Sequence, residues 1–95
     1  MKLEEAVYKV IRELNAKVFD SHVVINEIRN KPEYSEIYIH EIKENETIKN
    51  YHKRIACIIR DSGLVAAVQH NGEDLLISSK NIHGNLTSNH VWEKK

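Results

Sequence analysis

The spacing of apolar residues changes at Gly63, and this change constrains the fold more than any other feature of the chain. Before Gly63, apolar side chains recur every third or fourth position, and the clearest stripe is Ile48, Tyr51, Ile55, Ile58 and Ile59. After it, the runs "LVAAVQH" and "LLISS" flank Asn71-Gly72, a pair that favours a tight β-hairpin. The first spacing is typical of helices and the second of strands. We therefore expect three or four helices followed by a small antiparallel sheet, an α+β fold.

The boundaries of the early helices are indicated by capping residues. Residues 2–17 have apolar positions at helical spacing and predict the first helix. Asp20 and Ser21 are both residue types that cap helices, so a second helix is expected to begin there and to end at Pro32. The segment 33–43 fits either a third helix that begins with Pro32 or a short strand. We favour the helix, because turn signals are missing around it.

The last helix and the C-terminal strands follow the same reasoning. Asn45 or Thr47 can cap a helix over 48–62, and Gly63 is suited to the left-handed conformation that often ends one. Residues 80–89 are rich in turn-forming types and predict a polar loop. The segment "HVWEKK" then predicts a short closing strand in which Trp92 is buried.

Length and composition limit the class of protein. A chain of 95 residues corresponds to one domain, 1–95, with a single hydrophobic core. Cys57 is the only cysteine, which excludes an internal disulfide and a multi-cysteine zinc site and favours a reduced, cytoplasmic protein. No apolar stretch approaches the roughly 20 residues of a membrane span, and the N-terminal segment does not have the pattern of a signal peptide.

Charge is distributed unevenly along the chain, although the formal net charge is zero. Residues 1–48 contain seven Lys and Arg against ten Asp and Glu, whereas residues 49–95 contain seven against four. A difference of this kind suggests a charged partner on one side of the molecule. The neutral total opposes strong nucleic-acid binding, because such domains are usually basic overall.

The order of elements resembles that of a winged helix-turn-helix domain over nearly the whole chain. The tail "SSKNIHGNLTSNHVWEKK" is also similar to the ends of small winged-helix domains from bacteria and their phages, in which an Asn-Ile/Val-aromatic-Gly-Asn loop precedes a tryptophan. Here His83 stands at the aromatic position. The resemblance implies a non-catalytic, DNA-binding transcriptional regulator with helix 48–62 as the recognition helix and a wing at 70–90. A homodimer on paired half-sites is an expected assembly.

The candidate DNA-binding residues follow from that resemblance. They are Lys49, Asn50, His52, Lys53, Arg54 and Arg60 on the helix, and Lys80, His83 and Asn85 on the wing. Lysine and arginine neutralise phosphates, and asparagine and arginine can pair with the edges of adenine and guanine. If His52 or His83 were protonated beside a phosphate, DNA binding would weaken as the pH rises.

Other interpretations of the same residues remain open. The charged face of helix 48–62 can be an ordinary solvated surface. The chain can also be a protein-interaction module of the same fold, which would dock a larger protein through its acidic first helices or through a strip formed by Tyr34, Tyr38 and Tyr51. Alternatively, these tyrosines lie at the edge of the core with hydroxyls in water.

Enzyme and metal functions are not favoured. His52 and Cys57 are five positions apart, so they project about 140° apart around a helix and cannot form a nucleophile–base pair. The six histidines show neither the i, i+4 spacing of a helical metal site nor a metalloprotease motif. We expect no cofactor and no bound metal.

Overall fold

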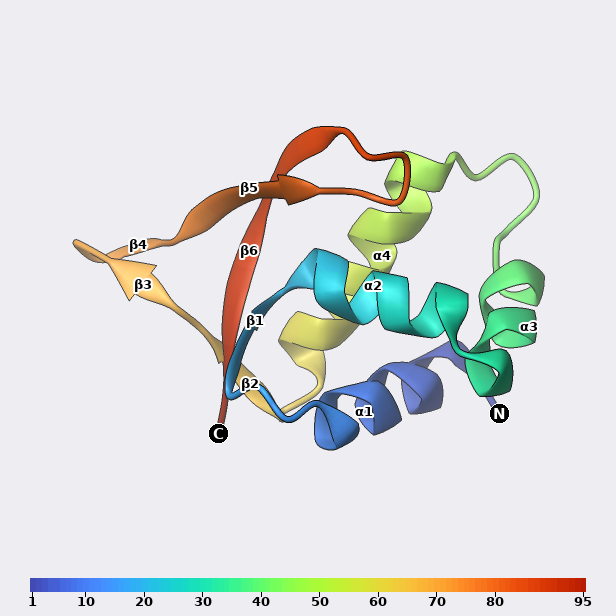
Figure 1. The fold of residues 1–95 in the computed structure, drawn as a ribbon, viewed down its shortest axis with the longest axis horizontal. Coiled ribbons are helices and arrows are strands. Elements are labelled where there is room, and N and C mark those ends of the chain that lie inside the picture. Colours follow the sequence, from blue (N-terminus) through green and yellow to red (C-terminus); the bar gives the residue numbers. More distant parts are fainter.

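All four helices lie in the first two thirds of the chain, and every strand except the short first one lies in the last third. The computed structural model describes all residues from 1 to 95 (Figure 1). The helices are α1 (Leu3–Glu13), α2 (Ser21–Asn30), α3 (Pro32–His40) and α4 (Ile48–Asp61). The strands are β1 (Val18–Asp20), β2 (Val65–Ala67), β3 (Gln69–His70), β4 (Glu73–Asp74), β5 (Leu76–Lys80) and β6 (Leu86–Lys94). The predicted α+β class is confirmed.

The capping residues act largely as predicted. The Asp20 carboxylate accepts a hydrogen bond from the Val23 amide at 3.1 Å and starts α2. Thr47, not Asn45, caps α4, because its hydroxyl accepts from the Asn50 amide at 3.1 Å. Pro32 is the first residue of α3, which confirms the helix over the ambiguous segment. Gly63 has a φ of 76°, the left-handed conformation expected after α4.

The first helix is shorter than predicted. It ends at Glu13 rather than at residue 17, because the following backbone pairs with the far end of the chain. The Lys94 amide donates to the Lys17 carbonyl at 2.8 Å, and β1 then runs antiparallel to β6. Strand β1 was not expected from the sequence, since its partner is a distant strand rather than a neighbouring one.

Strand β6 is the centre of the sheet. One of its edges pairs with β1, and the other pairs first with β2 and then with β5. Val91 joins these last two, because its carbonyl accepts from Val68 at 2.9 Å and its amide donates to Leu75 at 3.4 Å. The short β3–β4 hairpin is inserted between β2 and β5.

The predicted hairpin is therefore correct only at its tip. Asn71 and Gly72 have φ values of 54° and 81°, as a tight primed turn requires, but they join only β3 to β4. The flanking runs share one further bond, from the Leu75 amide to the Val68 carbonyl at 2.8 Å, and beyond it they pair with β6, which extends over nine residues. The predicted polar loop 80–89 is wrong for half of its length, since Lys80 belongs to β5 and residues 86–89 belong to β6.

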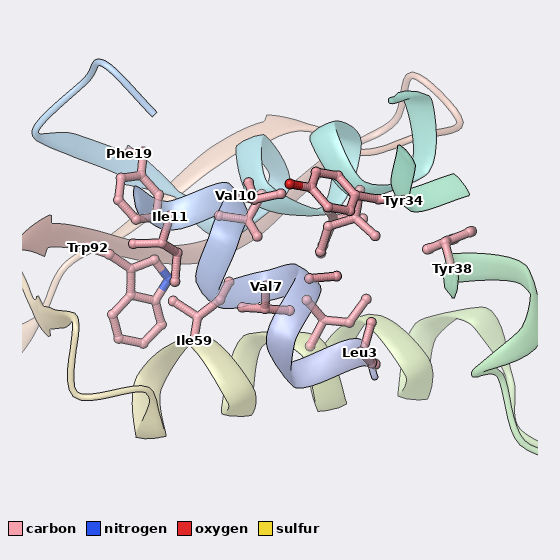
Figure 2. Packing of buried hydrophobic residues seen from close by; sticks show 14 of the residues in the cluster. Leu3, Val7, Val10, Ile11, Phe19, Tyr34, Tyr38, Ile59 and Trp92 are labelled. Carbon is pink, nitrogen blue, oxygen red and sulfur yellow. The ribbon is translucent and has the colours of Figure 1, made fainter. Parts of the chain in front are cut away.

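The core lies mainly among the four helices, and the sheet contributes Phe19, Val65 and Trp92 to it. Figure 2 shows Phe19 and Trp92 at one end of the buried cluster and Tyr34 and Tyr38 at the other. Trp92 is 2% exposed, which confirms the prediction that it is buried. The remaining labelled side chains come from α1 and α4 and fill the space between these two ends. No helix combines the length and the apolar character that crossing a membrane would require.

The tyrosines belong to this core. Tyr34 is 1% exposed and Tyr51 is fully buried. Their hydroxyls are bonded within the protein, from Tyr34 to the Glu13 carboxylate at 2.7 Å and from Tyr51 to the Tyr38 carbonyl at 2.6 Å. The expectation of wet hydroxyls at the core edge is wrong, because each hydroxyl has a protein partner. A tyrosine strip is not exposed for docking another protein.

Candidate functional site

A groove of about 840 Å³ lies between α4 and the hairpin formed by β5 and β6. This β5–β6 hairpin comprises residues 76–90, and its tip, residues 81–85, lies beside the N-terminal end of α4 (Figure 1). The helix side of the groove is lined by Ile48, Lys49, His52, Lys53, Ala56, Cys57 and Arg60. Polar groups from the hairpin and apolar groups from the core therefore meet one face of α4.

Three cations of α4 point to the same side of the helix. At about 100° per residue, Lys49, Lys53 and Arg60 project within roughly 40° of one another, and all three line the groove. We call them the basic stripe. Lys49 and Lys53 are exposed and form no ion pair, whereas Arg60 contacts Asp61 at 3.1 Å. Since both partners of that pair are exposed, it contributes little to holding Arg60.

Five of the nine residues singled out in the sequence line the groove. They are the basic stripe together with His52 and His83. Asn50, Lys80 and Asn85 are exposed but lie outside it. Arg54 also lies outside it, for a different reason.

The Arg54 side chain forms hydrogen bonds within the protein. Its Nε and Nη2 donate to the two carboxylate oxygens of Glu46 at 3.0 and 2.9 Å, and Nη2 also donates to the Glu41 carbonyl at 2.7 Å. The guanidinium lies 5.0 Å from the centre of the Tyr51 ring. The bonds from Arg54 and from the Lys43 amide lower the pKa of Glu46 to about 2. Arg54 thus holds the loop 41–47 against α4 and is not free to contact a ligand.

His52 is half-buried at the edge of the groove. Its Nε2 lies 2.8 Å from the Tyr38 hydroxyl. Burial lowers the pKa of His52, and the nearby His22, His83 and Arg29 lower it further. The imidazole is therefore neutral at neutral pH, which opposes the predicted role as a protonated phosphate contact.

The β5–β6 hairpin is fastened to the start of α2 by a cluster that the sequence did not indicate. We call His22, Ser79, Thr87 and Asn89 the His22 cluster. His22 Nδ1 lies 2.6 Å from the Ser79 hydroxyl, and Nε2 lies 3.1 Å from the Thr87 hydroxyl. The buried Asn89 accepts from the His22 amide at 3.3 Å and donates to Ser79 at 3.0 Å. No local pattern could reveal it, since His22 is 57 positions from Ser79 and 67 from Asn89.

The contact between His22 and Ser79 has the spacing of a nucleophile–base pair. Ser79 does not line the groove, however, and its oxygen already accepts a hydrogen bond from Asn89. The other ring nitrogen of His22 faces a hydroxyl rather than the carboxylate of a catalytic triad. The arrangement accounts for the position of the hairpin and does not favour catalysis.

The tip of the hairpin is ordered by Asn81. Its side-chain oxygen accepts from the amides of His83 and Asn85 at 2.9 and 3.1 Å. This bonding leaves the side chain of His83 exposed at the mouth of the groove. Asn81 itself lines the groove, although the sequence did not single it out.

No three His, Cys, Asp or Glu side chains are grouped closely enough to hold a metal ion. Asp74, the one acidic side chain lining the groove, lies 3.6 Å from His90, which stacks on Trp92. Comparison with protein-family models, with curated proteins and with solved structures gave no match. The geometry of the groove is therefore the basis for any functional conclusion.

Proposed function

We propose that this chain is a winged helix-turn-helix domain that binds duplex DNA without catalysis. In this proposal α4 is the recognition helix and the β5–β6 hairpin is the wing. The observation that carries the proposal is the basic stripe, which lines the side of α4 facing the hairpin. Lys49 and Lys53 have no carboxylate partner, so their charges are available to phosphates.

The topology supports the same assignment. The chain runs helix, strand, three helices and then strands, and the short β1 joins the sheet through β6 in the order β1-β6-β2. One feature departs from a simple helix-turn-helix, in which a turn of about three or four residues joins two helices. Here α3 and the loop 41–47 stand between α2 and α4.

Side chains on the open flank of α4 can read bases. Asn50 and Cys57 project about 80° and 60° from the centre of the basic stripe on the side where Lys53 lies, given ~100° per residue, and Cys57 also lines the groove. Both are exposed. In the proposed complex, the lysines set the register on the backbone, and Asn50 pairs with an adenine edge. A bacterial or phage transcriptional regulator, acting as a homodimer on two half-sites, is the role that fits such a module.

Fluorescence anisotropy with a labelled random-sequence duplex tests this proposal. Affinity should fall as salt increases, and the Lys49→Gln/Lys53→Gln variant should flatten the slope of log affinity against log salt by about two. The matched control is Lys2→Gln/Lys9→Gln, which removes the same charge from exposed positions on or beside α1. Absence of binding at low salt, or an equal effect of both variants, would overturn the proposal.

The alternative function is a protein-interaction module of the same fold. The burial of Tyr34 and Tyr51 removes the tyrosine strip from the surfaces available to such a partner. The acidic first half would then have to supply the docking face. A chain that fails to bind duplex at low salt while remaining folded favours this alternative.

A further inference from the structure

We propose that the groove binds a small amphipathic anion, an aromatic or branched apolar body that carries one acidic group. The ligand would enter the groove between α4 and the β5–β6 hairpin, and it would share Lys49 and Lys53 with the DNA contacts proposed above. The inference does not depend on DNA binding, and its test contains no DNA.

The size and lining of the groove fit such a ligand. Its volume of about 840 Å³ falls within the range of about 300–1,000 Å³ that is typical of small-molecule sites. Apolar side chains of α4 and of the β5–β6 hairpin line it, and the exposed ones among them are Ile48 and Leu76. A phosphodiester backbone can neutralise the lysines at the rim but cannot cover this apolar surface. An amphipathic ligand can neutralise the lysines and also cover the apolar surface.

The charge of the rim selects an anion. Lys49 and Lys53 lie without carboxylate partners on the helix side of the groove. Asp74, the one acidic side chain that lines the groove, lies against His90 on the strand side. A carboxylate or sulfonate placed beside α4 would therefore meet two uncompensated positive charges while its apolar part contacts the exposed side chains of Ile48 and Leu76.

The fluorescence of Trp92 can report binding of a ligand in the groove. Trp92 is the only tryptophan of the chain, and it lines the groove. The probe is anilinonaphthalene sulfonate, an aromatic anion that can accept excitation energy from tryptophan. We expect saturable, one-to-one binding to the folded protein, detected as quenching of Trp92 fluorescence and a rise in probe emission. The uncharged parent compound, phenylnaphthylamine, should bind more weakly because it lacks the sulfonate.

Two pairs of variants test separately how the lysine charges and the volume of the groove contribute to binding. Lys49→Gln/Lys53→Gln should weaken binding of the sulfonate by about fivefold and leave the uncharged parent compound unaffected, as expected for two exposed charges. Lys2→Gln/Lys9→Gln should change the affinity for neither probe. Ala56→Leu should abolish binding of both probes by filling the groove, whereas Ala66→Leu, on an exposed position of β2 outside the groove, should not. Near-ultraviolet circular dichroism checks that every variant is folded.

The inference is overturned by any of three results. These are no saturable binding to the folded wild-type chain, retention of binding in a folded Ala56→Leu variant, or equal effects of the two lysine pairs. If Ala56→Leu fails to fold, Ala56→Ile replaces it, and the lysine pairs decide the question on their own. Binding of the sulfonate with no binding of duplex would support this site while rejecting the DNA proposal, so the two can fail separately.

Discussion

The indole N–H of Trp92 donates a 2.8 Å hydrogen bond to the hydroxyl of Ser21, and both side chains are buried. The two residues are 71 positions apart in the chain. Their bond joins the start of α2 to the central strand β6, next to the groove that both residues line. It therefore connects the helical part of the fold to the sheet at the candidate site.

The first prediction concerns this bond. Ser21→Ala leaves the buried indole N–H without an acceptor and should lower the free energy of unfolding by about 1–3 kcal/mol. Urea unfolding followed by Trp92 fluorescence measures the change. Ser78→Ala, at an exposed position of β5, is the control and should stay within about 0.5 kcal/mol of the wild type. An equal decrease in the free energy of unfolding for the two variants would show that the bond from Trp92 to Ser21 does not stabilise the fold.

The second prediction concerns the His22 cluster. His22→Ala removes both ring contacts to Ser79 and Thr87 while leaving the core intact. Amide hydrogen exchange in β5 should become at least about tenfold faster, because the β5–β6 hairpin loses its attachment to α2. Exchange in α1 should not change. His70→Ala, in the exposed β3–β4 hairpin, is the matched control; a similar acceleration in that variant would argue against a specific clamp.

The third prediction follows from the lowered pKa of His52. Because folding favours the neutral imidazole, the unfolded chain takes up a proton first as the pH falls below the ordinary value of 6.5. This contribution to stability is therefore present above that pH and is lost below it. His52→Gln keeps a hydrogen-bonding group for Tyr38 and should make the decline in thermal stability between about pH 7 and 5 shallower. An unchanged slope in His52→Gln would refute the assignment.

The fourth prediction separates Arg54 from the basic stripe. Arg54→Gln removes the bonds to Glu46 and the Glu41 carbonyl and the contact with Tyr51, so it should lower the free energy of unfolding by about 1–2 kcal/mol. Lys53→Gln, one position earlier on α4, should change stability by less than about 0.5 kcal/mol. Urea unfolding at neutral pH compares the two variants.

The ion pair between Arg54 and Glu46 should also affect how stability changes at acidic pH. Arg54 and the Lys43 amide lower the pKa of Glu46 from 4.5 to about 2, so the stabilisation is complete above the ordinary value and is lost as the pH falls through this interval. The wild type should therefore lose stability between about pH 5 and 2 more steeply than Arg54→Gln does. Parallel pH profiles of the two proteins would show that the Arg54–Glu46 pair is not formed in solution.

Interactions between near neighbours in the chain were predictable. Thr47 and the left-handed Gly63 mark the two ends of α4 as expected. A helix begins and ends where nearby residues provide partners for its free backbone groups. The tight turn at Asn71-Gly72 also followed from its two residues alone. The burial of Trp92 was expected because it is the large aromatic side chain of a segment predicted to form a short strand.

Pairing between distant segments was not predictable. Strand β1 depends on backbone bonds to residues of β6 more than 70 positions away, and no local spacing encodes such a bond. The candidate site shows the same limit. Arg54 and Lys53 are adjacent cations in the sequence, yet Arg54 turns toward Glu46 because successive helical residues project about 100° apart.

The spacing of apolar residues and the capping types were sufficient to predict the helices, their order and the presence of a sheet after Gly63, since these features arise within one or two turns of the chain. Which strands pair, which cations face the groove and how the β5–β6 hairpin is held against α2 depend on contacts that form when the chain is packed. The His22 cluster and the bond from Trp92 to Ser21 are of this second kind, because each unites residues that only a folded core brings within hydrogen-bonding distance.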